Sequence, residues 1–260
     1  MGKAQFLRTR CTTSNEWGST VWMRILCATV LSIILAEPAF SADIKIQEWK
    51  FDSDPPGSVP GDFVPGKSSS EAGRWRVVED PKAPTPPNVL ASEATEPAAN
   101  AQIIFIDGLE AGSLDLTVRL KTSLGGEKQG AGVVFRAIDE RNYYVVWISP
   151  DEKRLRLDRV IDGEVTHLQD LNVDSADPGK WHTLRLSIHG PILEAVFNNR
   201  QFLSGREEKW EFGTDLKGNI GLWASGSNPA YFDTVRYTNM DETTSASGPL
   251  GFESGSTPRK

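Results

Sequence analysis

The segment from Gly130 to Val160 shows the clearest alternation of apolar and polar positions in the chain. It consists of three short runs separated by turns at 138–142 and 149–153, which are rich in Asp, Asn and Pro. A period of two with β-branched and aromatic residues is typical of strands, so we predict three consecutive antiparallel strands. We expect Phe135, Tyr143, Val145, Trp147, Leu155 and Leu157 on a core face, and Arg136, Asn142, Tyr144, Arg156 and Asp158 on an open face.

Similar runs recur on both sides of this segment, and none of them has the period of a helix. A long Pro/Gly/Ser segment at 52–73 is predicted to be irregular. Many short strands with frequent turn signals favour an all-β sandwich, here a single domain over 42–240. The further predicted strands are 44–51, 74–78, 88–92, 101–106, 114–121, 164–168, 181–189, 192–197, 202–203, 219–225 and 231–237.

The first part of the chain has a different pattern. Met23 and Arg24 precede an apolar run from Ile25 to Ala36, and small residues follow at Ala39 and Ser41. This order predicts a secretory signal peptide over 23–41, cleaved near Ser41, and so a periplasmic or secreted protein without stable membrane insertion. An uncleaved membrane anchor is the alternative reading. Residues 1–22 are then a mis-assigned or cytoplasmic preface, and the Ser/Thr/Gly-rich residues 241–260 are predicted to be a disordered tail.

Composition and net charge exclude several classes of function. A net charge of -7 without a Lys/Arg cluster argues against nucleic acid as a partner. The two cysteines, Cys11 and Cys27, both precede the predicted sandwich, which therefore has no disulfide, Cys metal site or thiol nucleophile. The three histidines lack metal-ligand spacing, and no G-x-S-x-G motif is present. No strand carries the two carboxylates that glycoside hydrolysis needs on one face.

Six short motifs occur in a fixed order along the chain. They are GRWRVVED at 73–80, GVVFR at 132–136, NYY at 142–144, GKWHTL at 179–184, GNIGLW at 218–223 and YFDTV at 231–235. In this order they resemble the concanavalin A-like lectin/glucanase superfamily. The nearest resemblance is to laminin-G-like domains and to the bacterial 3-keto-disaccharide hydrolase domain, a former domain of unknown function.

The resemblance implies a jelly-roll sandwich of two curved antiparallel sheets, with a concave face that holds sugar in the carbohydrate-active members. It places Arg136 on that face. Where hydrolase-like members have Glu and Gln, this chain has Tyr144 and Val146, and where they have Gln and His it has Trp223 and Ser225. These departures argue against catalysis.

The residues themselves offer a sugar-binding set. Flat aromatic rings cover the C–H face of a sugar, and fixed polar groups meet its hydroxyls. We predict Tyr144 and Trp223 as platforms, with Arg136, Asn142, Arg156, Asp158 and Ser225 as further ligand-binding residues. A sheet decorated by aromatic pairs and ion pairs is the alternative explanation. Trp75, Trp147 and Trp181 are assigned to the core.

No cofactor is required by this scheme, although a structural Ca²⁺ held by Asp52 and Asp233 is an option, since hard cations prefer oxygen ligands. The leading hypothesis is an exported, non-catalytic, lectin-like module whose partner is a glycan or small saccharide. The alternatives are a glycoside hydrolase of the 3-keto-disaccharide type and a periplasmic protein-interaction domain.

Overall fold

The computed structural model describes residues 45–67, 73–94, 101–125, 128–206 and 217–241. The predicted preface at 1–22, the signal peptide at 23–41 and the tail beyond Asp241 lie outside these ranges. The described residues form fifteen strands and no helical element. None of them belongs to a helix long and apolar enough to cross a membrane.

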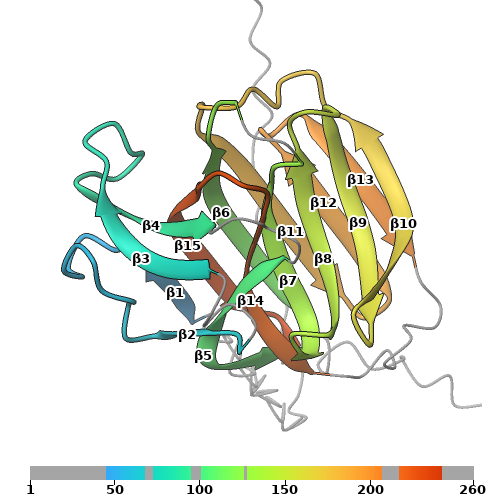
Figure 1. Ribbon diagram of the computed structural model, residues 1–260. Helices are drawn as coiled ribbons and strands as arrows, with labels where there is room; N and C mark the ends of the chain where they lie inside the picture. The colour runs from blue at the N-terminus through green and yellow to red at the C-terminus, as the bar shows by residue number, and fades with distance from the viewer. Residues whose placement is uncertain (1–44, 68–72, 95–100, 126–127, 207–216, 242–260) are drawn as a thin grey trace, which may run out of the picture. The chain divides into compact units, whose positions relative to one another are not determined.

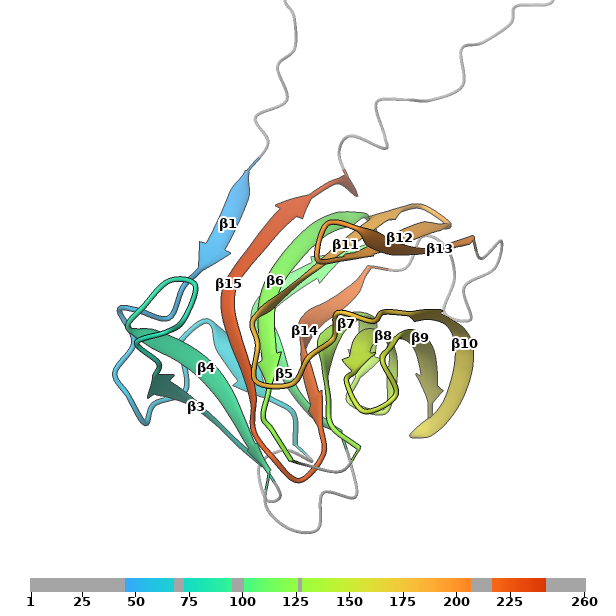
Figure 2. The same ribbon diagram turned by 90° about the horizontal axis from the view of Figure 1, so that it is seen from above.

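The strands form two antiparallel sheets, which lie in two facing layers (Figures 1 and 2). The eight-stranded sheet contains β13 (Gln201–Arg206), β12 (Ile192–Phe197), β11 (His182–His189), β6 (Leu114–Thr122), β15 (Ala230–Asn239), β4 (Asn88–Ala94), β3 (Gly73–Glu79) and β1 (Ile46–Trp49). The seven-stranded sheet runs β10 (Glu164–Asn172), β9 (Arg154–Ile161), β8 (Asn142–Ser149), β7 (Gly130–Asp139), β14 (Gly218–Ser225), β5 (Gln102–Ala111) and β2 (Phe63–Pro65). The predicted all-β jelly-roll sandwich is confirmed.

Strand β15 is central to the eight-stranded sheet. One of its edges pairs with β6, while the other is divided between β4 and β1. Ala230–Phe232 pair with β4, and Val235–Thr238 pair with β1. The first and last predicted strands are therefore neighbours.

The core lies between the two sheets and follows from the alternation of the strands. In β6, Leu114, Leu116, Val118 and Leu120 are fully buried, and the residues between them are more exposed. Strand β11 alternates in the same way. Trp75, with only 2% of its surface exposed, belongs to this core, as predicted. Trp181 instead lies against Lys121 of β6, with the ammonium 4.7 Å from the ring centroid.

One strand was missed. Phe63–Pro65 form β2, which pairs with β5, although the Pro/Gly-rich segment was predicted to contain no regular structure. Phe63 is buried against Phe51, with the ring centroids 5.5 Å apart. A three-residue edge strand that ends in Pro shows too little alternation to be recognised in the sequence.

Candidate functional site

The outer face of the seven-stranded sheet carries a groove of about 1070 Å³. Strands β8, β9 and β14 supply its floor, and the turns that join β7 to β8, β8 to β9 and β9 to β10 line it as well. A second apolar cluster, separate from the sandwich core, lies on this face. It contains Ile103, Val134, Ala137, Tyr143, Val145, Val160 and Trp223, with Trp147 packed against it.

The face predicted for β8 was wrong by one residue. Tyr143, Val145 and Trp147 line the groove, whereas Tyr144 is fully buried in the sandwich core. Tyr144 pairs with Phe135 of β7, and their rings stack with centroids 5.6 Å apart. Both faces of β8 are apolar, so the alternation of its residues does not identify the inner face. Tyr144 is therefore no platform in this groove, and Trp147 is not a core residue.

Arg136 also lies inside the protein, contrary to the prediction of an open face. The register between β7 and β8 shifts after Phe135, and Arg136 has a backbone φ of 48°. A bulge of this kind redirects the side chain. The guanidinium is fully buried, and its Nη2 donates hydrogen bonds to the carbonyls of Gly112, at 3.0 Å, and Gly190, at 2.7 Å.

Two tryptophans meet in the groove above strand β7. Trp147 of β8 and Trp223 of β14 both pair with Gly132 of β7, so the three residues form one row across the sheet. The two indole rings are 5.0 Å apart between centroids, at an interplanar angle of 41°. A Cβ on Gly130 would lie 2.6 Å from Trp147 Cε3 and 2.8 Å from Trp223 Cζ3. The glycines thus leave the space in which the two rings meet.

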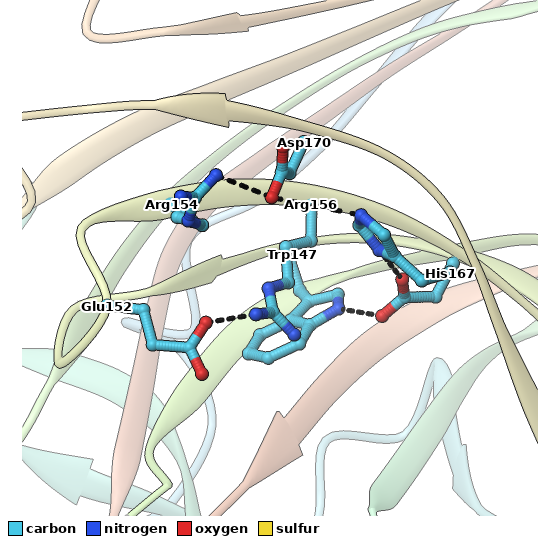
Figure 3. Close-up of polar contacts among 7 residues, drawn as sticks. Trp147, Glu152, Arg154, Arg156, His167 and Asp170 are labelled. Atoms are coloured by element: carbon cyan, nitrogen blue, oxygen red, sulfur yellow. Dashed lines mark hydrogen bonds and ion pairs between the residues drawn. The ribbon is translucent and has the colours of Figure 1, made fainter.

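The indole N–H of Trp147 donates a hydrogen bond to a carboxylate, which is the dashed line beside the labelled Trp147 in Figure 3. Asp158 of β9 accepts a hydrogen bond of 2.6 Å from Trp147 Nε1, and its other oxygen lies 2.8 Å from His167 Nδ1. The Asp158 side chain is 7% exposed and that of His167 is 47% exposed. Asp170 of β10 lies 3.8 Å from His167 Nε2 and accepts a hydrogen bond of 2.6 Å from Arg154. Polar contacts therefore link β8, β9 and β10 at one side of the groove.

The remaining predicted residues lie in different places. Arg156 lines the groove, pairs with Glu152, and places its guanidinium 5.4 Å from the centroid of the Trp147 ring (Figure 3). Ser225 also lines it, and its Oγ donates to the carbonyl of Lys128 at 3.2 Å. Asn142 is not among the lining residues. It holds the adjacent turn, because its amide nitrogen donates to Asp139 and its oxygen accepts from the Asp162 N–H.

Tyr143 adds a hydroxyl to the floor of the groove. Burial raises the pKa of its phenol, a hydrogen bond from Trp223 Nε1 at 3.4 Å opposes this, and the Asp158 carboxylate raises the pKa again. The phenol is therefore protonated at neutral pH and keeps a hydrogen to donate.

The proposed calcium ligands have separate protein partners. Asp233 is fully buried, and its carboxylate accepts hydrogen bonds from the N–H and hydroxyl of Thr85 and from the N–H of Thr234. Asp52 accepts a hydrogen bond from the N–H of Asn88 at 3.3 Å. Within the described ranges, no group of three His, Cys, Asp or Glu side chains could hold a metal. The N–H and O–H groups of Thr85 and Thr234 point their hydrogens at the Asp233 carboxylate, where a cation would need oxygen lone pairs. Calcium binding stays a prediction.

Of the seven predicted ligand-binding residues, the groove brings together Arg156, Asp158, Trp223 and Ser225. It adds Tyr143, Trp147 and Glu152, which the sequence analysis missed. One signal was present. Gly130 and Gly132 occupy alternate positions of one strand, and such glycines mark a face on which neighbouring side chains approach the backbone.

No protein-family profile matches the chain, and no curated protein matches it in sequence. Solved structures do match its fold. The carbohydrate-binding module CBM66 from Bacillus subtilis has a TM-score of 0.54 at 12% identity, over 68% of this chain and 96% of that one. A β-glucanase from Bacillus licheniformis has a TM-score of 0.52 at 12% identity, over 75% of this chain and 98% of that one. A Bacillus subtilis protein of unknown function with a galectin-like fold has a TM-score of 0.51 at 10% identity, over 68% of this chain and 89% of that one.

Identities this low show the fold alone. The chain shares its β-sandwich fold with these structures, and the sequence motifs led us to expect a sandwich of the concanavalin A-like kind.

Proposed function

We propose that this protein is a glycan-binding β-sandwich module whose binding site is the groove on the outer face of the seven-stranded sheet. The observation that carries the proposal is the pair formed by Trp147 and Trp223 in a concave site. Trp147 is half-buried and Trp223 is 7% exposed, so Trp147 offers most of the open ring surface and Trp223 packs beside it. An open indole in a groove suits the C–H face of a sugar ring, while neighbouring polar groups suit its hydroxyls. The likeness to a carbohydrate-binding module and a β-glucanase supports this choice.

In this proposal each part of the groove has a distinct task. Trp147 and Trp223 form the apolar floor, and the Tyr143 hydroxyl offers a hydrogen-bond donor beside them. Arg156 and Glu152 form a polar rim, with 27% and 50% of their side-chain surfaces exposed. An ion pair at the rim presents both donors and acceptors, which vicinal sugar hydroxyls require.

Binding without catalysis is the form we favour. Glycoside hydrolysis needs one carboxyl group to act as an acid and a second to act as a base or nucleophile. Two of the groove acids already have protein partners, since Asp158 binds Trp147 and His167, and Glu152 pairs with Arg156. Membership of the laminin-G-like or 3-keto-disaccharide hydrolase group, and export by the segment 23–41, belong to the same proposal and rest on the sequence motifs.

The test is a glycan array followed by calorimetry on the glycans that bind. We expect Trp147→Ala and Trp223→Ala each to weaken binding about 30-fold, the equivalent of about 2 kcal/mol. Trp181→Ala is the matched control, because Trp181 contacts Lys121 of the other sheet. Loss of binding in the control alone, or no binding to any glycan, would overturn the proposal. Product analysis on the bound glycans would detect hydrolysis and contradict the non-catalytic form.

A further inference from the structure

The charges around the groove are unbalanced. Its lining contains twice as many carboxylates as cationic side chains. The carboxylates are Glu140, Asp151, Glu152, Asp158, Asp162 and Glu164, whereas the cations are Lys128, Arg141 and Arg156. In a concave site with apolar walls, such an excess makes the local electrostatic potential more negative and selects ligands by charge.

The three cations offset half of the six negative charges, and both guanidinium groups among them contact groups of the protein. Arg156 is paired with Glu152, so its positive charge is met by one of the groove's own carboxylates. Arg141 donates to the backbone carbonyl of Asp162 and lies beside Gly163 at the turn between β9 and β10. Recognition of a carboxylate or sulfate group typically uses the fork of an arginine aimed at the ligand. Here the guanidinium of Arg156 contacts the Glu152 carboxylate, and that of Arg141 donates to the backbone carbonyl of Asp162.

Two exposed acids at the entrance extend the negative surface. Asp162, in the turn that follows β9, and Glu164, the first residue of β10, flank Gly163, and both line the groove. Asp162 follows Arg156, the β9 partner of Trp147, by six residues, or roughly 20 Å of strand, so a ligand reaches this turn only if it extends from the tryptophans along β9. With the Arg141 guanidinium beside the turn, these two carboxylates leave one net negative charge there, which would repel an anionic ligand and attract an ammonium group.

We infer that the groove selects its glycan by charge: it favours saccharides that carry a protonated amine over their neutral counterparts, and it excludes saccharides that carry carboxylate or sulfate groups. This inference rests on the proposed function, because it assigns the ligand class of the same site. It adds a direction of selectivity that the tryptophan pair alone does not give.

The experiment uses the whole chain and matched oligosaccharides. Each glycan found to bind on the array is compared by calorimetry with analogues of the same backbone that carry an amine, a carboxylate or a sulfate. We expect the amino form to bind best and the anionic forms to bind at least about tenfold more weakly than the neutral form. The preference should shrink when the salt concentration rises from about 0.02 M to about 0.5 M, because salt screens exposed charges.

Two double variants test where the selectivity arises. Asp162→Asn with Glu164→Gln removes two groove charges, and Asn suits the φ of 52° at position 162. We expect this variant to bind anionic analogues several-fold better and to leave the neutral glycan's affinity within about twofold. Glu79→Gln with Glu194→Gln is the matched control, since it removes two exposed charges from the eight-stranded sheet. It should leave the selectivity unchanged.

The outcomes separate the two proposals. Equal or tighter binding of anionic analogues by the wild-type protein would overturn the charge selectivity and leave the glycan site in place. An equal effect of the control variant would also overturn it, because the selectivity would then reflect net charge and not the groove. Absence of any glycan binding would overturn the proposed function, and this inference with it.

Discussion

Gly130 shows how a single missing side chain shapes the groove. Three side-chain atoms lie within 2.8 Å of the place where its Cβ would be, and two of them belong to the paired tryptophans. Because these atoms are on side chains that can move, Gly130→Ala should displace the indoles without breaking the sheet. We expect a change in tryptophan fluorescence, weaker glycan binding, and a loss of less than about 1 kcal/mol in the free energy of unfolding.

The neighbouring Gly132 provides the comparison. A Cβ there would lie 2.3 Å from the backbone carbonyl of Val146, which the paired strand holds in place. Gly132→Ala should therefore lower the free energy of unfolding by about 1–3 kcal/mol, as measured by urea denaturation, because the backbone itself must shift. Equal losses in the free energy of unfolding for the two variants would contradict this explanation. So would an unchanged fluorescence in Gly130→Ala, because Gly130 would then not be the residue that makes room for the two indoles.

Tyr237 gives a prediction in alkali. Burial, with a smaller contribution from Asp241, raises the pKa of its phenol to about 12. The unfolded chain releases this proton near pH 10, so the stability that the protonated phenol contributes falls as the pH rises from about 10 to about 12. We expect Tyr237→Phe to reduce the difference in unfolding free energy between pH 9 and pH 11.

At neutral pH the same variant should have little effect. Tyr237 is 2% exposed, and its hydroxyl has no hydrogen-bond partner among the described residues. Removal of a buried hydroxyl without a partner is close to neutral or stabilising. Tyr231→Phe, beside Lys121, is the control. A Tyr237→Phe variant with an unchanged alkaline profile would show that this phenol is not the group that titrates.

At the scale of the strand, Asp158 joins three elements. Its carboxylate lies on β9, accepts the indole N–H of β8 and contacts His167 of β10. Asp158→Ala would leave Trp147 Nε1 without its acceptor and should cost about 1–3 kcal/mol of stability. We also expect about tenfold weaker glycan binding, since the tilt of Trp147 is then no longer fixed.

Asp158→Asn separates position from charge, because its amide oxygen can still accept the indole hydrogen bond. It should recover most of the glycan affinity that Asp158→Ala loses. Equal losses of affinity in the two variants would argue that the negative charge, and not the hydrogen bond to Trp147, matters for binding.

Strands also show what the sequence could reveal. β6 and β11 alternate clearly, because each has one buried face and one more exposed face, and their inner residues could be read directly. β8 could be located but not oriented, since both the sandwich core and the groove floor demand apolar residues from it. On β9, where Arg156 and Asp158 alternate with leucines, the predicted face is the observed one. The predicted site residues of β8, β9 and β14 therefore lie on strands that line the groove, but the face predicted for β8 was the wrong one.

On the scale of the whole molecule, the bulge at Arg136 connects the two sheets, because it turns the Arg136 side chain toward two turns that lead into strands of the other layer. Arg136 extends from the seven-stranded sheet to Gly112, in the turn between β5 and β6, and to Gly190, in the turn between β11 and β12. It thereby ties the two layers together at one end of the sandwich. No local pattern in the sequence reports such a contact, because its partners are backbone carbonyls 24 and 54 residues away.

This placement makes Arg136 a stability residue. Arg136→Met would remove two charge-assisted hydrogen bonds and leave two carbonyls without them, at a cost of about 2–4 kcal/mol. For a domain of this size we expect a Tm lower by about 5–10 °C. Arg185→Met is the control, because Arg185 is 53% exposed on β11 and should change the stability by less than about 0.5 kcal/mol. At temperatures where the variant is folded, its glycan affinity should equal that of the wild type, whereas a selective loss of affinity with an unchanged Tm would return Arg136 to the binding site.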